Sequence, residues 1–146
     1  MSTQTLHMLL DLANDKLETA VRVLSIERRT LGAEKDKLEM LLSYYEQYQD
    51  TTRSQAKAGV TAIQMRNATE FLQRLGAAID QQKAQVKLVG ERLDLCSQEL
   101  IDAQTEVKKY QLLLDRKAEE ASRQTHRREQ KMNDEMAARL VRQAQE

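Results

Sequence analysis

The sequence offers few residues of the kinds that carry out catalysis or bind metal ions. It contains one cysteine, Cys96, and two histidines, His7 and His126, which lie far apart in the chain. Neither their number nor their spacing matches a zinc site, and a single cysteine cannot form an internal disulfide. We interpret Cys96 as a buried apolar residue, with a reactive thiol as the alternative.

No sequence motif of an enzyme is present. There is no glycine-rich phosphate loop, no Gly-x-Ser-x-Gly motif and no His-Glu-x-x-His motif. The many carboxylates are expected on a solvated helix surface, where they contribute little to acid–base catalysis. We therefore predict a protein that is not an enzyme and that uses no cofactor or metal ion.

The composition is typical of long helices that form coiled coils. The 146 residues include no Pro and only 4 Gly, while 32 % are charged and 3 % are aromatic. Strand and turn formers are thus too scarce for a sheet, and the apolar share of 40 % is too high for a disordered chain. We predict an all-α fold and a single elongated domain over residues 1–146.

Charge and hydropathy exclude several classes of partner. Basic and acidic residues both number 23, so the net charge is zero and no overall field attracts nucleic acid or anionic lipid. The longest apolar stretches, such as residues 6–10, are far shorter than the roughly 20 residues that cross a bilayer. The N-terminal residues also lack the features of a signal peptide, which predicts a cytoplasmic location without membrane insertion.

Apolar residues recur every seven residues in each half of the chain. In the first half, heptad positions a and d fall at Leu6, Leu10, Ala13, Leu17, Ala20, Leu24, Glu27, Leu31, Glu34, Leu38, Leu41, Tyr45 and Tyr48. In the second half, they fall at Leu72, Leu75, Ile79, Gln82, Val86, Val89, Leu93, Cys96, Leu100, Ala103, Val107, Tyr110, Leu114 and Ala121. This period predicts two helices, over about 4–56 and 62–142, that supercoil left-handedly around a partner.

The sequence between the two heptad patterns favours a reversal of the chain, at about residues 57–61. Gly59 suits a turn, and Thr61-Ala62-Ile63-Gln64 matches a capping box that opens a helix, with residues 67–70 as a later alternative start. If the numbers of paired residues add up to 120, the a and d positions of both halves face each other. We therefore predict an antiparallel hairpin, about 75 Å long at 1.5 Å per residue, whose second helix overhangs after about residue 116.

Two glutamates interrupt the apolar positions of the first helix. Glu27 and Glu34 both occupy d positions, opposite apolar residues of the second helix. We expect their carboxylates to reach the edge of the hairpin near Arg28 and Arg92. Polar residues inside a coiled coil specify its register at the expense of stability, which is our interpretation; a role in docking another protein is the alternative.

Apolar side chains near the turn exceed what the two heptad patterns require. Leu42 and Tyr44 lie outside the a and d positions, and the fold-back brings Tyr44 and Tyr48 close to Phe71 and Leu75. Because aromatic side chains are enriched at protein interfaces, we interpret this cluster as a binding surface. The alternative is that these side chains only cover the end of the hairpin.

The overhanging segment is rich in helix formers and in charged residues of both signs. Its basic and methionine side chains are Arg123, Arg127, Arg128, Lys131, Met132 and Met136. A solvated helix is one interpretation, and a helix that becomes ordered inside a partner protein is the other. Nucleic acid is a poor candidate because no aromatic residue is available there to stack on a base.

The residues around the turn resemble those of a known family. LEMLLSYYEQYQ (residues 38–49) followed by EFLQRLGAAIDQQ (residues 70–82) resembles the flagellar FliJ family, coiled-coil proteins of about this length. Two positions depart from it, because Gln82 stands where relatives can carry a histidine and Lys37 where they can carry a glutamine. The resemblance implies a component of the flagellar type III protein export apparatus, associated peripherally with the inner membrane.

The resemblance also implies a role for each end of the hairpin. The terminal helices would enter the hexameric export ATPase as a stalk, and members are also linked to escort of export chaperones. Our own interpretation of the overhang adds the six tail residues named above as the contacts with the ATPase. The membrane-embedded export gate would bind a patch near the turn, formed by Leu41, Tyr44, Tyr48, Phe71, Leu75 and Ala78. The isolated chain is expected to be a monomer. Alternatives are the equivalent stalk protein of a virulence type III secretion system and a structural homodimeric coiled coil.

Overall fold

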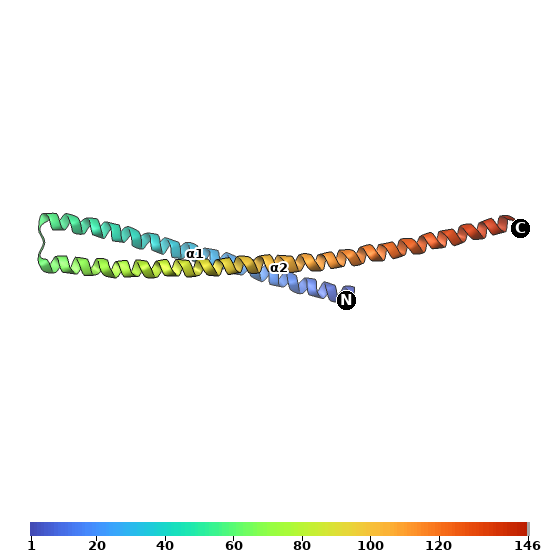
Figure 1. The fold of residues 1–146 in the computed structure, drawn as a ribbon, viewed down its shortest axis with the longest axis horizontal. Coiled ribbons are helices and arrows are strands. Elements are labelled where there is room, and N and C mark those ends of the chain that lie inside the picture. The colour runs from blue at the N-terminus through green and yellow to red at the C-terminus, as the bar shows by residue number, and fades with distance from the viewer. Residues whose placement is uncertain (146) are drawn as a thin grey trace. The chain divides into compact units, whose positions relative to one another are not determined.

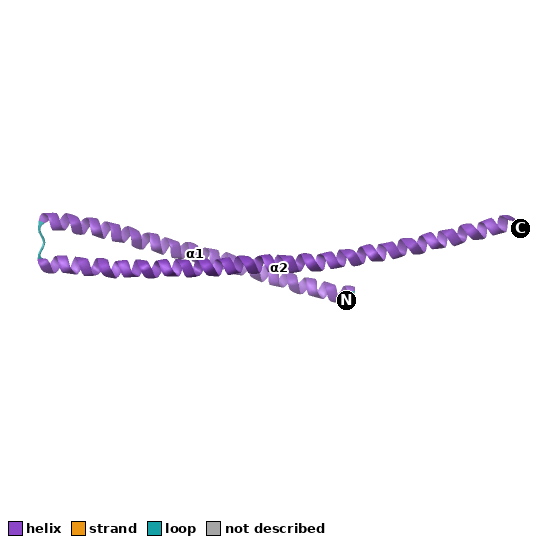
Figure 2. Ribbon diagram, in the orientation of Figure 1, coloured by secondary structure: helices purple, strands orange, loops and turns teal. Residues whose placement is uncertain are grey.

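The computed structural model describes residues 1–145, which form two α-helices joined by a short loop (Figure 1). Helix α1 spans Thr3–Ala58 and α2 spans Ala62–Gln145, and only the loop between them is non-helical along the middle of the chain (Figure 2). The heptad pattern predicts slightly shorter helices, over about 4–56 and 62–142. The all-α fold with two long helices packed against each other is confirmed.

Local sequence explains where the helices begin and where α1 ends. Gly59 follows α1 with a φ of 93°, in the left-handed region that glycine adopts without a steric penalty. The backbone N–H of Gln64 donates to Thr61 Oγ1 (3.2 Å), and that of Thr61 donates to Gln64 Oε1 (3.1 Å), which is the predicted capping box. The alternative helix start at residues 67–70 is therefore wrong. At the other helix start, the N–H of Thr5 donates to Ser2 Oγ (3.1 Å).

The contacts divide the chain into two units, each containing a part of both helices. The first unit combines residues 1–18 with the segment that begins at Asp102, and buries Leu6, Ala13 and Val107. The Lys117 ammonium donates to the carbonyl oxygen of Met1, and all described residues after Lys117 are exposed. Ala121, a predicted a position, is thus exposed, because α1 has no residues left to face it.

The second unit comprises residues 19–101 and follows the predicted heptads closely. Its buried side chains are Leu24, Ile79 and Val89, and its remaining a and d positions from Leu72 onward and in α1 are half-buried. Two cross-helix contacts report the register, because the numbers of Glu34 and Gln82 add up to 116 and those of Tyr48 and Phe71 add up to 119. The predicted sum of 120 is correct to within a few residues.

Candidate functional site

The aromatic patch near the turn combines side chains from α1 and α2. The rings of Tyr48 and Phe71 lie 4.5 Å apart between centroids, at an interplanar angle of 48°. Tyr44, Tyr48, Phe71 and Leu75 line a groove of about 370 Å³. Tyr44 is 53 % exposed and Phe71 47 %, so both rings present about half of their surface to solvent. The contact with Tyr48 holds the Phe71 ring in place while leaving about half of its surface available to a partner, as an aromatic anchor requires.

Of the other residues of the predicted gate surface, Leu41 and Ala78 do not line this groove. Leu41, Tyr48, Leu75 and Ala78 are half-buried. They contribute to the packing between the helices, so their exposed area is smaller than that of Tyr44 and Phe71. The structure thus brings four of the six predicted residues together around one groove, namely Tyr44, Tyr48, Phe71 and Leu75.

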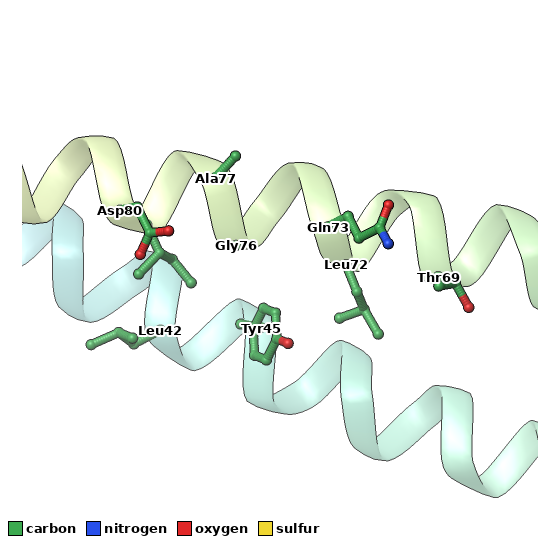
Figure 3. A pocket seen from close by; sticks show the side chains of 9 residues that line it. Leu42, Tyr45, Thr69, Leu72, Gln73, Gly76, Ala77 and Asp80 are labelled. Carbon is green, nitrogen blue, oxygen red and sulfur yellow. The ribbon is translucent and has the colours of Figure 1, made fainter.

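Leu42 does not belong to the aromatic patch, although it is close to Tyr44 in sequence. It lines a second groove together with Tyr45, Leu72 and Gly76, none of which lines the first groove (Figure 3). The heptad explains the separation, because positions e (Leu42) and g (Tyr44) flank opposite sides of the a and d positions. From the sequence alone, the surplus apolar residues were treated as one group, and the second groove was missed. The heptad letters could have separated Leu42 from Tyr44, although they do not show that a groove exists.

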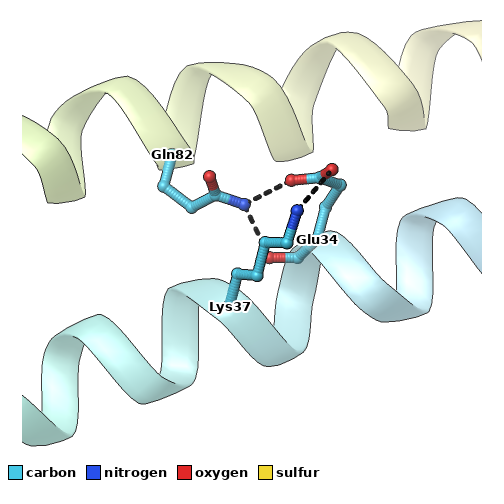
Figure 4. Close-up of polar contacts among 3 residues, drawn as sticks. All are labelled: Glu34, Lys37 and Gln82. Carbon is cyan, nitrogen blue, oxygen red and sulfur yellow. Dashed lines mark hydrogen bonds and ion pairs between the residues drawn. The ribbon is translucent and has the colours of Figure 1, made fainter.

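The polar residues inside the hairpin find partners across the helices. The Gln82 side-chain amide donates to the Glu34 carbonyl oxygen (2.9 Å) and to Glu34 Oε2 (2.5 Å), and Lys37 Nζ lies 3.7 Å from Glu34 Oε1 (Figure 4). The expectation that Glu34 reaches an arginine is wrong, because Gln82 is close enough to bind it directly. This polar layer links one position of α1 to one position of α2, as a residue that specifies register does.

Glu27 occupies the same heptad position, d, as Glu34, but its carboxylate has fewer polar contacts. Arg92 Nε is 4.0 Å from Glu27 Oε2, as predicted, whereas Arg28 forms no ion pair with either glutamate in the described part of the chain. Glu27 Oε2 is buried and has no hydrogen-bond partner among residues 1–145. The side chain is 20 % exposed, so this carboxylate weakens the packing around it rather than forming a binding site.

Cys96 behaves as an internal residue of the hairpin. It is half-buried, and desolvation, followed by the nearby carboxylates of Glu27 and Glu99, raises the pKa of its thiol, while Arg92 acts in the opposite direction. A higher thiol pKa means less of the reactive thiolate at neutral pH. No three His, Cys, Asp or Glu side chains within residues 1–145 are placed to hold a metal ion.

The tail after Lys117 presents its predicted residues to solvent. Arg123, Arg127, Arg128, Lys131, Met132 and Met136 are all exposed. Arg123 pairs with Glu119 on the same helix at 3.8 Å, a contact of low energetic value at the surface. Over the described residues, neither helix has a stretch long and apolar enough to cross a membrane.

Comparison with known proteins gives matches along the whole chain. A family model described as "Flagellar FliJ protein" matches residues 1–146. The Flagellar FliJ protein of Escherichia coli (strain K12) is 29 % identical over 131 residues, covering 90 % of this chain and 89 % of that protein. The Flagellar FliJ protein of Salmonella typhi is 28 % identical over 136 residues, covering 93 % and 92 %.

One solved structure has the same architecture. It is that of a protein described as a YscO homologue, CT670, from Chlamydia trachomatis, with a TM-score of 0.66 and 20 % sequence identity. The match covers 96 % of this chain and 91 % of that chain. At this identity the likeness shows the fold alone, which agrees with the two-helix hairpin described above.

Proposed function

The chain belongs to the flagellar FliJ protein family, whose members are non-enzymatic components of the flagellar export apparatus, and from this premise we propose that it connects two partners there. One partner is the export gate, bound by the aromatic patch. The other is the hexameric export ATPase, bound by the tail after Lys117. The observation that carries the proposal is that both surfaces hold exposed side chains that no other part of the described chain covers.

The aromatic patch is suited to a stable protein contact. The proposed surface consists of Leu41, Tyr44, Tyr48, Phe71, Leu75 and Ala78. Tyr44 and Phe71 supply exposed rings, and the orientation of the Phe71 ring is restricted by its contact with the Tyr48 ring. Such rings lose little conformational entropy on binding, which is why aromatic residues dominate the energetics of many interfaces.

The tail is suited to a weaker and more adaptable contact. Arg123, Arg127, Arg128, Lys131, Met132 and Met136 are proposed to contact the ATPase. A helix within a ring of identical subunits meets several equivalent surfaces, so polar contacts and flexible methionines fit better than a rigid apolar face. The tail's mixed charges make this contact sensitive to salt.

Three further elements of the proposal rest on the family alone. We propose that the chain is cytoplasmic, that it associates peripherally with the inner membrane through the export apparatus, and that it assists the escort of export chaperones. The virulence-type stalk is not favoured, because the full chain matches the flagellar family model.

A truncated chain tests the proposed division of labour. Ending the chain after Lys117 removes the proposed ATPase contacts but leaves the aromatic patch in place, since the patch lies in residues 19–101. We expect this variant to lose stimulation of ATP hydrolysis by the purified export ATPase and to keep its affinity for the gate's cytoplasmic domain. If the truncated chain still binds and stimulates the ATPase, the proposed role of the tail is wrong.

A further inference from the structure

The solvent-facing side of α1 over residues 19–33 carries positive charge only. The charged residues of this stretch are Arg22, Glu27, Arg28 and Arg29. Glu27 occupies a d position and is only 20 % exposed, and Arg92 Nε of α2 lies 4.0 Å from its carboxylate. All three arginines of the stretch are exposed. The stretch therefore presents three guanidinium groups to solvent and no exposed carboxylate.

Two of these arginines have no counter-charge nearby on their own helix. Neither Arg28 nor Arg29 has an acidic residue three or four positions before or after it. In the described part of the chain, neither forms an ion pair or a side-chain hydrogen bond. Arg22 differs, because its Nη2 donates to Thr19 Oγ1 at 3.4 Å and Glu18 lies one turn before it. The positive charge is thus concentrated in the second half of the stretch.

The residues between the arginines are small or apolar, and they recur with the heptad. Three heptad positions, b, c and f, lie on the side of α1 that faces away from α2. The arginine face, as this surface is called here, consists of Arg22 and Arg29 at f, Ser25 and Gly32 at b, Ile26 and Ala33 at c, and Arg28 at its edge. All seven residues are exposed, and Ile26 has 57 % of its surface in contact with solvent.

The hairpin itself does not require a glycine at residue 32. A Cβ added at Gly32 would meet no atom within 4 Å, and the residue lies inside α1 without a positive φ. Glycine in a helix interior is destabilising relative to alanine, so the intramolecular packing gives no reason for it. Together with Ser25 and Ala33, Gly32 leaves a low surface beside Ile26. The distance between two packed helices depends on the side chains at their contact, so another helix could approach α1 closely there.

The geometry of the arginine face suits a helix better than an extended segment. From Arg22 to Ala33 the face rises about 16 Å, which is three helical turns. A helix that crosses α1 at a shallow angle meets equivalent residues every seven positions, which is the spacing of the pairs on this face. An extended strand would find no backbone partners, because the backbone groups of α1 are already hydrogen-bonded within the helix.

The charge of the face selects among the possible occupants. Guanidinium groups bind carboxylates through paired hydrogen bonds, which favours an acidic protein segment. A flat anionic membrane is disfavoured, because the exposed carboxylates of Glu18 and Asp36 lie just beyond the two ends of the face on the same side of α1. A second copy of this chain is disfavoured, because a two-fold contact would place arginines against arginines. Nucleic acid is disfavoured, because residues 19–33 contain no aromatic side chain.

We propose that the arginine face binds an acidic amphipathic helix of a partner protein. Carboxylates seven residues apart in that helix pair with Arg22 and Arg29, and small apolar residues between them pack against Ile26 and Gly32. The face is separate from the aromatic patch, since Arg29 precedes Tyr44 by about 22 Å along α1. The site is additional to the gate and ATPase contacts and does not depend on them.

The test uses the full chain and a defined probe. The probe is a fluorescently labelled helical peptide of about five turns, with glutamates every seven residues and alanine and leucine between them, and binding is measured by fluorescence anisotropy. We expect Arg29→Glu, which reverses the charge, and Gly32→Leu, which blocks close approach, each to weaken binding about tenfold or more. Gly32→Ala keeps the surface low, so its affinity should stay within about twofold of wild type.

Matched controls separate binding at the arginine face from changes elsewhere. Arg53→Glu makes the same charge change at another exposed position of α1, and Ala84→Leu adds the same side chain to the outer side of α2, so both should bind the probe like wild type. Circular dichroism establishes that each variant retains its helices. A Phe71→Ala variant should also bind the probe normally, so that a failure of this proposal is distinct from a failure of the gate assignment.

Several results would overturn the proposal. They are equal binding of a probe with glutamines in place of the glutamates, unchanged binding by Arg29→Glu, and equal weakening by Arg53→Glu or Ala84→Leu. Competition of phosphatidylglycerol vesicles with the probe for this face, or self-association of the chain that Arg29→Glu abolishes, would also overturn it, because each would identify a different occupant.

Discussion

The ring of Phe71 contributes both to folding and, under the proposed function, to binding of the export gate. It is 47 % exposed, and its centroid is 4.5 Å from that of Tyr48. Phe71→Ala removes about half of the 1.5–3 kcal/mol that full burial of such a side chain provides, together with about 0.5–1.5 kcal/mol from the aromatic pair. We therefore expect the free energy of unfolding to fall by about 1–3 kcal/mol.

The effect on gate binding should be considerably larger than the effect on folding suggests. Under the proposed function, the exposed half of the ring is buried in the complex with the gate, as at an interface hot spot. Truncation of such a residue costs about 2–4 kcal/mol, which corresponds to about a 30- to 700-fold loss of affinity. Because the helices persist, this loss would be observed in a folded protein.

Leu42→Ala provides a matched control for this experiment. Leu42 is 43 % exposed and lines the second groove, so its truncation also costs folding free energy but leaves the aromatic patch intact. Calorimetry with the gate's cytoplasmic domain should give an affinity within about twofold of wild type, and thermal melts followed by circular dichroism report stability. Equal weakening by both variants, or none by Phe71→Ala, would refute the assignment of the patch.

Three other predictions concern the hairpin itself. Glu27→Leu removes a buried carboxylate oxygen without a hydrogen bond, so the free energy of unfolding should rise by about 1–3 kcal/mol in urea titrations; a decrease would show that Glu27 contributes to folding. Gly59→Ala forces a side chain into the left-handed region and should lower the free energy of unfolding by about 1–2 kcal/mol. An unchanged free energy of unfolding would show that residue 59 does not need a positive φ. Because burial and carboxylates raise the pKa of the Cys96 thiol, its alkylation at pH 8 should be slower than that of a free cysteine and recover as pH increases. Equal alkylation rates of Cys96 and a free cysteine at pH 8 would contradict the raised pKa of the Cys96 thiol.

The regular part of the fold could be predicted from the sequence because it depends on a repeated pattern. A heptad places Leu24 and Val89 inside the hairpin whatever their neighbours are, and the Thr61 to Gln64 capping box depends only on residues close in sequence. The exception is Ala121, which keeps the pattern but faces no residue of α1. A repeat predicts the side of a helix that packs, but the end of the partner helix decides where the packing stops.

The surfaces between the helices were harder to predict because they depend on pairs of side chains. The partner of Glu34 is Gln82 and not an arginine, since a shift of a few residues in the register changes which polar groups meet. The second groove lies where Gly76 on α2 comes close to Tyr45 on α1, beside Leu42. Neither sequence segment alone indicates a groove, and only their juxtaposition does.

The central claim is that one chain connects the export ATPase to the export gate through separate surfaces. The most direct measurement is the mass of the complexes formed when the full chain is mixed with both purified partners, by size-exclusion chromatography with light scattering. We predict that the full chain gives one complex that contains all three components. Truncation after Lys117 or the Phe71→Ala substitution should each leave a complex of only two components. If the gate domain displaces the ATPase from the full chain, the two surfaces are not independent and the claim is wrong.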